Sequence, residues 1–181
     1  ERADLLVLGV HRDRPLADLF RETTMERIVR QVGCPVLLVR RPAVAAYGAV
    51  VGAVDFSPAS AAALRKAAEV APGARLVAVH AVHVPYRGLM PADAAGSFIG
   101  EAEAAEAGWR QRETLPAALG KVALVEGAIG QVLTDVVRRE DAELITVGAH
   151  ARSGVHNALV GSFATRMMRD APCDLLIARP T

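Results

Sequence analysis

Short runs of consecutive apolar residues alternate along this chain with longer stretches in which apolar and polar residues are mixed. Leu5–Leu8 and Leu144–Val147 are uninterrupted apolar runs that each follow an acidic residue. Runs of this kind are typical of strands that are buried on both faces of a parallel sheet. Further strands are predicted at Val36–Val39, Ala49–Asp55, Arg75–Val82, Lys121–Val125 and Leu175–Ala178.

Helices are predicted in the mixed stretches between these runs. Ser57 followed by Pro58 is typical of a helix N-cap with proline in the first turn. Residues 83–100 contain three glycines and two prolines and are predicted to form a long loop. The five predicted helices are Met25–Val32, Ser60–Val70, Glu101–Leu119, Ile129–Arg139 and Phe163–Asp170.

The beginning of the chain repeats its end. Residues 1–41 align without a gap with residues 140–180 at a constant offset of 139, and 10 of the 41 pairs are identical. The identities include a Gly-x-His sequence and a cysteine in register. Chance similarity between two strand–helix–strand units is the alternative, and the constant offset argues against it.

Strands and helices alternate throughout, which indicates right-handed βαβ crossovers, a parallel sheet and an α/β fold. Residues 43–181 are predicted to form one complete five-stranded domain. Residues 1–42 are predicted to be the C-terminal third of a second domain, so we expect the remnant of a tandem protein. Val36–Val39 and Leu175–Ala178 would be exposed sheet edges, so we expect them to pair antiparallel, within a chain or across a dimer.

The composition excludes several classes of protein. Hydrophobic residues make up 52% of the chain and charged residues 23%, which excludes a disordered chain. The net charge of +1, without a basic stripe, argues against a nucleic-acid partner. No apolar run is long enough for a membrane span, and no signal peptide is expected from the first residues. The two cysteines, Cys34 and Cys173, are predicted to be small core residues in a reducing, cytoplasmic setting.

Short segments of residues 43–181 match the landmarks of one known family. They are VDFSPAS at 54–60, LVAVHAV at 76–82, Glu126-Gly127, LITVGAH at 144–150, Gly161-Ser162 and APC at 171–173. On these segments the chain resembles the universal stress protein family. The resemblance implies a doubly wound parallel sheet of order 3-2-1-4-5, of the adenine-nucleotide alpha-hydrolase type, with helices on both faces. It also implies dimers or tandem pairs joined through the last strand.

Many members of that family bind ATP, and those members carry the motif G-x2-G-x9-G-[ST] after the fourth strand. Here Gly148, Gly161 and Ser162 keep the spacing, while Ala151 stands where the second glycine is expected. The backbone N–H groups of Gly161, Ser162 and Phe163 would bind phosphate at a helix start. A plain helix N-cap at Ser162 is the alternative.

The resemblance assigns further residues to ATP, with or without Mg²⁺. Asp55, at a strand end, would contact the adenosine, or would cap the following helix together with Ser57. The backbone at Ala81 and Val82 would receive the adenine edge. Gly127 would line the ribose, or serve as a turn glycine. His150 beside the glycine motif either contacts phosphate or is an ordinary loop histidine.

The first copy of the repeat lacks this chemistry. Gly9 and Thr23 remain, but Arg12 and Glu22 replace the other two glycines. A carboxylate at a phosphate site repels the ligand, so this half is predicted to bind no nucleotide.

Three functions remain open from the sequence. The first is an ATP-binding regulatory module of the stress response. The second is a dimerisation or regulatory module with an empty pocket. The third is weak ATP hydrolysis, for which Asp55 and His150 are remote candidates; no motif of a nucleophile, general base or metal site is present.

Overall fold

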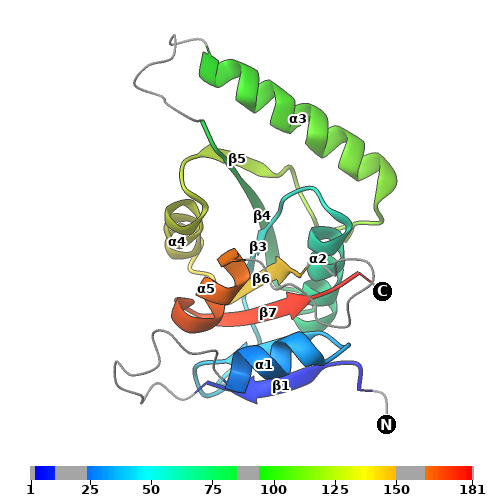
Figure 1. The fold of residues 1–181 in the computed structure, drawn as a ribbon. Helices are drawn as coiled ribbons and strands as arrows, with labels where there is room; N and C mark the ends of the chain where they lie inside the picture. Colours follow the sequence, from blue (N-terminus) through cyan, green and yellow to red (C-terminus); the bar gives the residue numbers. More distant parts are fainter. Residues whose placement is uncertain (1–2, 11–23, 85–93, 150–161, 181) are drawn as a thin grey trace.

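The computed structural model describes residues 3–10, 24–84, 94–149 and 162–180, which form one seven-stranded sheet with helices packed on it (Figure 1). The strands are β1 (Leu6–Gly9), β2 (Val36–Val39), β3 (Ala49–Ala53), β4 (Arg75–Val82), β5 (Ala123–Glu126), β6 (Leu144–Gly148) and β7 (Asp174–Ala178). The helices are α1 (Thr24–Gln31), α2 (Pro58–Val70), α3 (Ala94–Arg112), α4 (Ile129–Arg139) and α5 (Ser162–Asp170). None of these helices is long and apolar enough to cross a membrane.

The five strands of residues 43–181 lie in the order β5-β4-β3-β6-β7, and each pairs in parallel with its neighbours. In chain order this is 3-2-1-4-5, so the predicted doubly wound topology is confirmed. The sheet continues beyond five strands because β2 pairs antiparallel with β7, and β1 pairs in parallel with β2. The expected pairing of the two final strands is therefore present within one chain, and β2 occupies the outer edge of β7.

The repeat in the sequence appears in the structure as two matching halves around this antiparallel pair. Leu37 lies opposite Leu176, its counterpart at the offset of 139. Arg40 donates from Nη2 to the carbonyl of Met168 at the end of α5, at 2.7 Å. Its counterpart Arg179 donates to the carbonyl of Val29, the counterpart of Met168, at the end of α1. Each half therefore caps the C-terminus of the other half's helix.

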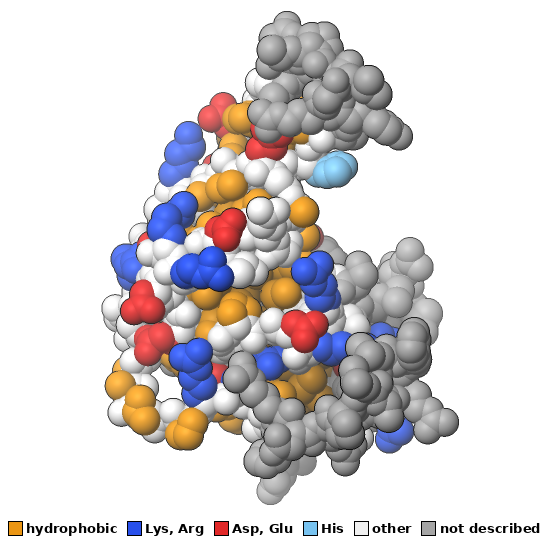
Figure 2. All heavy atoms as spheres, turned by 90° about the vertical axis from the view of Figure 1, so that its left-hand side faces the viewer, with side chains coloured by type: hydrophobic (Ala, Val, Ile, Leu, Met, Phe, Trp, Pro, Cys, Tyr) orange, Lys and Arg blue, Asp and Glu red, His pale blue; other side chains and the backbone are white. Residues whose placement is uncertain are grey.

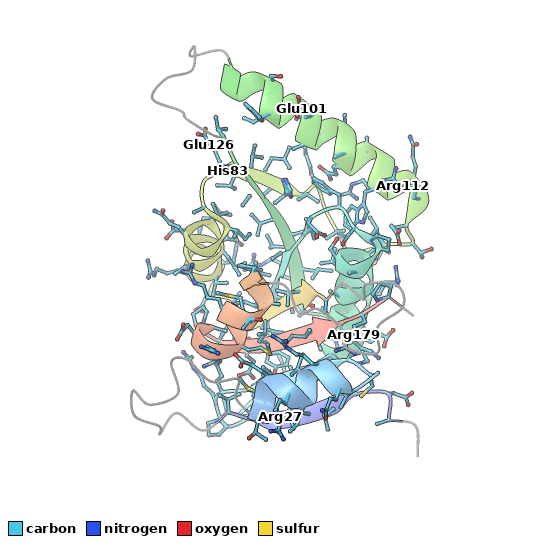
Figure 3. All side chains as sticks on the ribbon, viewed as in Figure 1. Arg27, His83, Glu101, Arg112, Glu126 and Arg179 are labelled. Atoms are coloured by element: carbon cyan, nitrogen blue, oxygen red, sulfur yellow. The ribbon has the colours of Figure 1, made fainter. Side chains whose placement is uncertain are left out.

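Figure 3 shows Arg179 at the end of β7 beside α1, where it makes these contacts. The same guanidinium also donates to the carbonyls of Arg30 and Val32. Basic side chains interact favourably with the negative end of a helix dipole, and they satisfy carbonyls that have no partner within the helix. These contacts fasten residues 24–39 to the rest of the sheet.

The two faces of the sheet are covered by different helices. Ala61 and Leu64 of α2 and Trp109 of α3 pack with Ala78 of β4 on one face. Helices α1, α4 and α5 cover the other face in one continuous cluster, which includes Val29, Leu133 and Met168. Because Val29 shares that cluster, α1 buries apolar side chains against residues 43–181.

A buried ion pair also joins the two halves. Glu26 of α1, with 1% of its surface exposed, accepts from Arg169 of α5 through two hydrogen bonds of 2.6 and 3.2 Å. Such a bidentate pair has a fixed geometry, so it orients α1 against α5.

Most predicted elements are found within one or two residues of their predicted bounds, and β2, β4 and α4 have the bounds that the sequence predicts. The prediction for α3 is wrong. The helix begins at Ala94, inside the predicted loop, and ends at Arg112, well before Leu119. It ends there because the ring of Pro116 would clash with the carbonyl four residues earlier, at position 112. Gly96 and Gly100 weaken the helix pattern without breaking the helix.

Candidate functional site

A pocket of about 280 Å³ opens where the carboxyl ends of β3, β4 and β6 meet the first turns of α4 and α5. In the part of the chain that the structure describes, it is lined by Ala53, Val54, Asp55, His80, Ala81, Ile129, Val147, Gly148 and Phe163. Strands β3 and β6 are neighbours, but α2 follows β3 on one face of the sheet and α5 follows β6 on the other. Ligands of open α/β sheets bind at this kind of switch point.

Figure 2 shows the molecule from the side on which α4 lies. Acidic and basic side chains are interspersed there around exposed hydrophobic ones, and neither sign of charge forms a continuous patch.

Asp55 both lines the pocket and supports the start of α2. Its Oδ1 accepts hydrogen bonds from the Ser57 backbone N–H at 3.1 Å and from Ser57 Oγ at 2.5 Å. Ser57 Oγ in turn accepts from the Ser60 N–H at 3.2 Å, which makes Ser57 the N-cap of α2. The two interpretations of Asp55, ligand contact and cap support, are thus compatible with one position.

The turn between β3 and α2 is held by aromatic side chains. Phe56 has φ +60°, a left-handed conformation that costs a non-glycine residue about 1–2 kcal/mol. Its ring contacts His80 and Trp109, with ring centroids 4.5 and 5.7 Å away. Trp109 donates from Nε1 to the Ser57 carbonyl at 3.0 Å, and His80 Nδ1 lies 2.8 Å from the Val54 carbonyl. These contacts offset the strain and fix the backbone that carries Asp55.

A carbonyl oxygen can accept a hydrogen bond and cannot donate one. His80 Nδ1 therefore carries the proton in its contact with Val54. In the neutral ring the other nitrogen, Nε2, is then an acceptor.

Gly148 is pressed against the first turn of α2. A Cβ at this position would lie 2.5 Å from the Ala59 carbonyl carbon and 2.6 Å from the Ser60 nitrogen. Carbon atoms in contact are normally about 3.5–4.0 Å apart, so no side chain fits unless α2 or β6 moves. Gly148 therefore has a packing role in addition to its place in the pocket wall.

Two other glycines lie at the start of α4. Gly127 has φ +145°, which requires glycine, and its N–H donates to the Val82 carbonyl at 3.1 Å. This bond ties the end of β5 to the end of β4. Gly130 is covered by the guanidinium of Arg166, since a Cβ there would lie 2.9 Å from Nη2.

The predicted site residues fall into four groups. Asp55, Ala81, Gly148 and Phe163 line the pocket. Ser57, Val82 and Gly127 lie next to it in the sequence but are not among its described lining residues. His150, Ala151 and Gly161 lie outside the described residues, as do Arg12, Glu22 and Thr23 of the first copy; Ser162 begins α5.

Five further residues line the pocket that the sequence motifs do not identify: Ala53, Val54, His80, Ile129 and Val147. Four of them lie at or beside strand ends, where the rule for open α/β sheets places a ligand.

Metal ions and redox chemistry find little support among the described residues. No group of three or more His, Cys, Asp or Glu residues there is placed to hold a metal ion. Asp55 is the carboxylate among the described lining residues. Mg²⁺ is often held by one carboxylate and substrate phosphates, so Asp55 fits a metal that arrives with a nucleotide and does not by itself form a resident site. Burial raises the pKa of the Cys173 thiol to about 12, which keeps it protonated and unreactive.

Comparison with solved structures supports the fold. A protein from Pseudomonas aeruginosa UCBPP-PA14, described as a universal stress protein, matches with 20% identity and a TM-score of 0.68, over 98% of this chain and 63% of that one. A universal stress protein from Archaeoglobus fulgidus matches with 16% identity and a TM-score of 0.64, over 98% of this chain and 61% of that one. This chain thus spans less than two thirds of the length of either structure.

A shorter relative matches three quarters of this chain. Universal stress protein UspA from Lactobacillus plantarum has 27% identity and a TM-score of 0.59, and the match covers 75% of this chain and 99% of that one. Among curated protein sequences, none matches. The model of the universal stress protein family matches residues 1–40 and 46–179, nearly the whole sequence. The chain therefore belongs to the universal stress protein family.

Proposed function

We propose that this chain binds ATP in the pocket at the carboxyl ends of β3, β4 and β6, and acts as a regulatory module of the stress response. One observation carries the proposal. Asp55, Ala81, Gly148 and Phe163, which the family resemblance assigns to the nucleotide, come from four separate segments and line the same pocket.

The chemistry of the pocket suits the nucleoside part of the ligand. Ala53, Ile129 and Val147 provide apolar surface for a flat purine, and Asp55 provides an acceptor for ribose hydroxyls or an exocyclic amine. A volume of about 280 Å³ lies near the lower end of the roughly 300–1,000 Å³ typical of small-molecule sites. The phosphate chain would extend out of the pocket toward the start of α5.

The proposal is tested by calorimetric titration of the chain with ATP, with GTP as the comparison. We expect ATP to bind more tightly than GTP and to raise the melting midpoint, because a ligand that binds the folded state stabilises it. Asp55→Asn should weaken the binding of both ATP and adenosine. Asp135→Asn is the matched control, since Asp135 is exposed on α4 and pairs loosely with Arg138 at 3.9 Å. Absence of heat and of a thermal shift at millimolar ATP would refute the proposal.

A second candidate is a regulatory module whose pocket stays empty. Gly148 favours it, because the close approach of α2 requires glycine there whether or not a nucleotide binds. The departure at Ala151 points the same way. Nucleotide released from the purified protein by heat would count against this alternative.

We also propose that residues 1–42 are the C-terminal third of a first family domain and residues 43–181 a complete second one. The reciprocal capping by Arg40 and Arg179 supports this division. Association of two chains through β7 would require an edge that β2 already occupies, so the expected self-association is better sought elsewhere on the molecule.

A further inference from the structure

The guanidinium of Arg166 lies flat on the first turn of α4 at the edge of the pocket. The ideal Cβ position of Gly130 is 2.9, 3.1 and 3.2 Å from Arg166 Nη2, Cζ and Nη1. Because these three distances are nearly equal, the plane of the guanidinium faces Gly130. Its N–H groups, which lie in that plane, therefore point along the surface of α4 and not into it.

Two sequence neighbours connect this side chain to the pocket. Phe163, which lines the pocket, lies one turn before Arg166 on α5, and residues three apart lie on the same face of a helix. Ile129, which also lines the pocket, precedes Gly130 on α4. The guanidinium thus bridges the two helices at the side of the pocket that they form.

Arg166 is exposed, and no hydrogen bond or ion pair is found for it within the described part of the chain. The other arginines of this region differ. Arg169 binds Glu26, and Arg179 binds the carbonyls at the end of α1. A guanidinium presents donors in a fork that matches phosphate, so an unoccupied one beside a ligand pocket is suited to an anionic group.

We propose that Arg166 binds the polyphosphate chain of the nucleotide whose base occupies the pocket. Gly130 is the residue that permits this, because any larger side chain there would displace the guanidinium. The proposal rests on the proposed function and adds a residue that discriminates nucleotides from nucleosides. The negative charge of Asp55, on the β3 side of the pocket, disfavours an alternative in which the phosphates lie next to that carboxylate without a metal.

The test compares ATP, adenosine and inorganic tripolyphosphate by calorimetry. Arg166→Gln should weaken the binding of ATP about tenfold and leave the affinity for adenosine unchanged, as expected for loss of a charge-assisted contact with phosphate. Gly130→Ala should weaken the binding of ATP to a smaller extent, since it moves the guanidinium without removing it. Arg27→Gln is the matched control, because Arg27 is the counterpart of Arg166 in the repeat and lies exposed on α1 (Figure 3).

The results separate this inference from the proposed function. Equal ATP affinity in the wild type and Arg166→Gln, or an equal loss for ATP and adenosine, would overturn the role of Arg166. If neither ATP nor adenosine binds the wild type, the proposed function fails. In that case the binding of tripolyphosphate tests the anion site at Arg166 separately. If the wild type binds tripolyphosphate and Arg166→Gln does not, the anion site is supported, and any other result overturns it. Urea unfolding of each variant verifies that it is folded.

Discussion

The strongest prediction concerns Gly148 and its counterpart Gly9, which occupy the same place in the two halves of the repeat. Replacing Gly148 with alanine puts a Cβ 2.5 Å from the Ala59 carbonyl carbon and 2.7 Å from its oxygen. Relief requires a movement of about 1 Å, since carbon contacts are normally about 3.5–4.0 Å. The obstructing atoms belong to backbone, and the turn before them is fixed by the Trp109 hydrogen bond to Ser57.

Overpacking of this kind costs about 1–3 kcal/mol. We expect Gly148→Ala to lie at the upper end of that range, because no flexible side chain can move aside. For a protein of this size, such a cost lowers the melting midpoint by roughly 4–12 °C. Gly9→Ala should change the free energy of unfolding by less than about 0.5 kcal/mol. Among the described residues no atom lies within 4 Å of its Cβ position, and its φ is not in the left-handed region.

Urea unfolding measures both variants against the wild type. Trp109 is the single tryptophan of the chain and is fully buried between α3 and the β3–α2 turn, so its fluorescence reports directly on the affected region. If Gly148→Ala lowers the free energy of unfolding by less than about 0.5 kcal/mol, or if the two variants lower it equally, the packing role of Gly148 is refuted.

Three further predictions concern the contacts between the halves and the buried thiol. Arg179→Gln removes the contacts to the carbonyls at the end of α1 and should cost about 1–3 kcal/mol of unfolding free energy, measured in urea. Glu26→Gln leaves Arg169 without its carboxylate partner. Because the Arg169 side chain is one-third exposed, we expect the free energy of unfolding to fall by roughly 2 kcal/mol, which is less than the full cost of breaking a buried pair. Cys173 has its pKa raised to about 12 by burial, so the unfolded chain loses this proton first and stability should fall as the pH rises from about 9 toward 12. Cys173→Ala should reduce that fall, and a wild type whose unfolding free energy is unchanged between pH 8 and 10 would contradict the assignment.

The strands of this fold were predictable because they are short apolar runs, and β3, β6 and β7 are buried along nearly their whole length. The expectation of burial on both faces is wrong for β1, an edge strand in which Val7 is 55% exposed. Arg75–Val82 and Val36–Val39 have the bounds that their residue pattern indicates. The prediction failed at α3, where two rules compete. Glycines at 96 and 100 suggest a loop, but the alanines around them sustain a helix, and Pro116 ends it several residues earlier than the polar pattern suggests.

The candidate site was predictable to a smaller degree. Asp55 and Gly148 stand directly at strand ends, so a local motif identifies them. Ile129 and His80 reach the same pocket through the packing of α4 and the pairing of β4, which no short motif encodes. The packing role of Gly148 was also invisible, because it depends on a helix that begins about 90 residues earlier in the chain.

The two halves of the repeat share the contacts that join them and differ at their strand ends. Arg40 and Arg179 make equivalent contacts with the helix of the opposite half, at α5 and α1 respectively. Gly148 is enclosed by α2, whereas Gly9 is exposed and has no neighbouring atoms at its Cβ position. Among the described residues, the first half therefore contributes an interface to the sheet, and the second half contributes the residues that line the pocket. The pairing of β2 with β7 stabilises the sheet beside β6, whose end lines the pocket. In the part of the chain that the structure describes, residues 24–39 thus support the sheet that carries the pocket and are not among its lining residues.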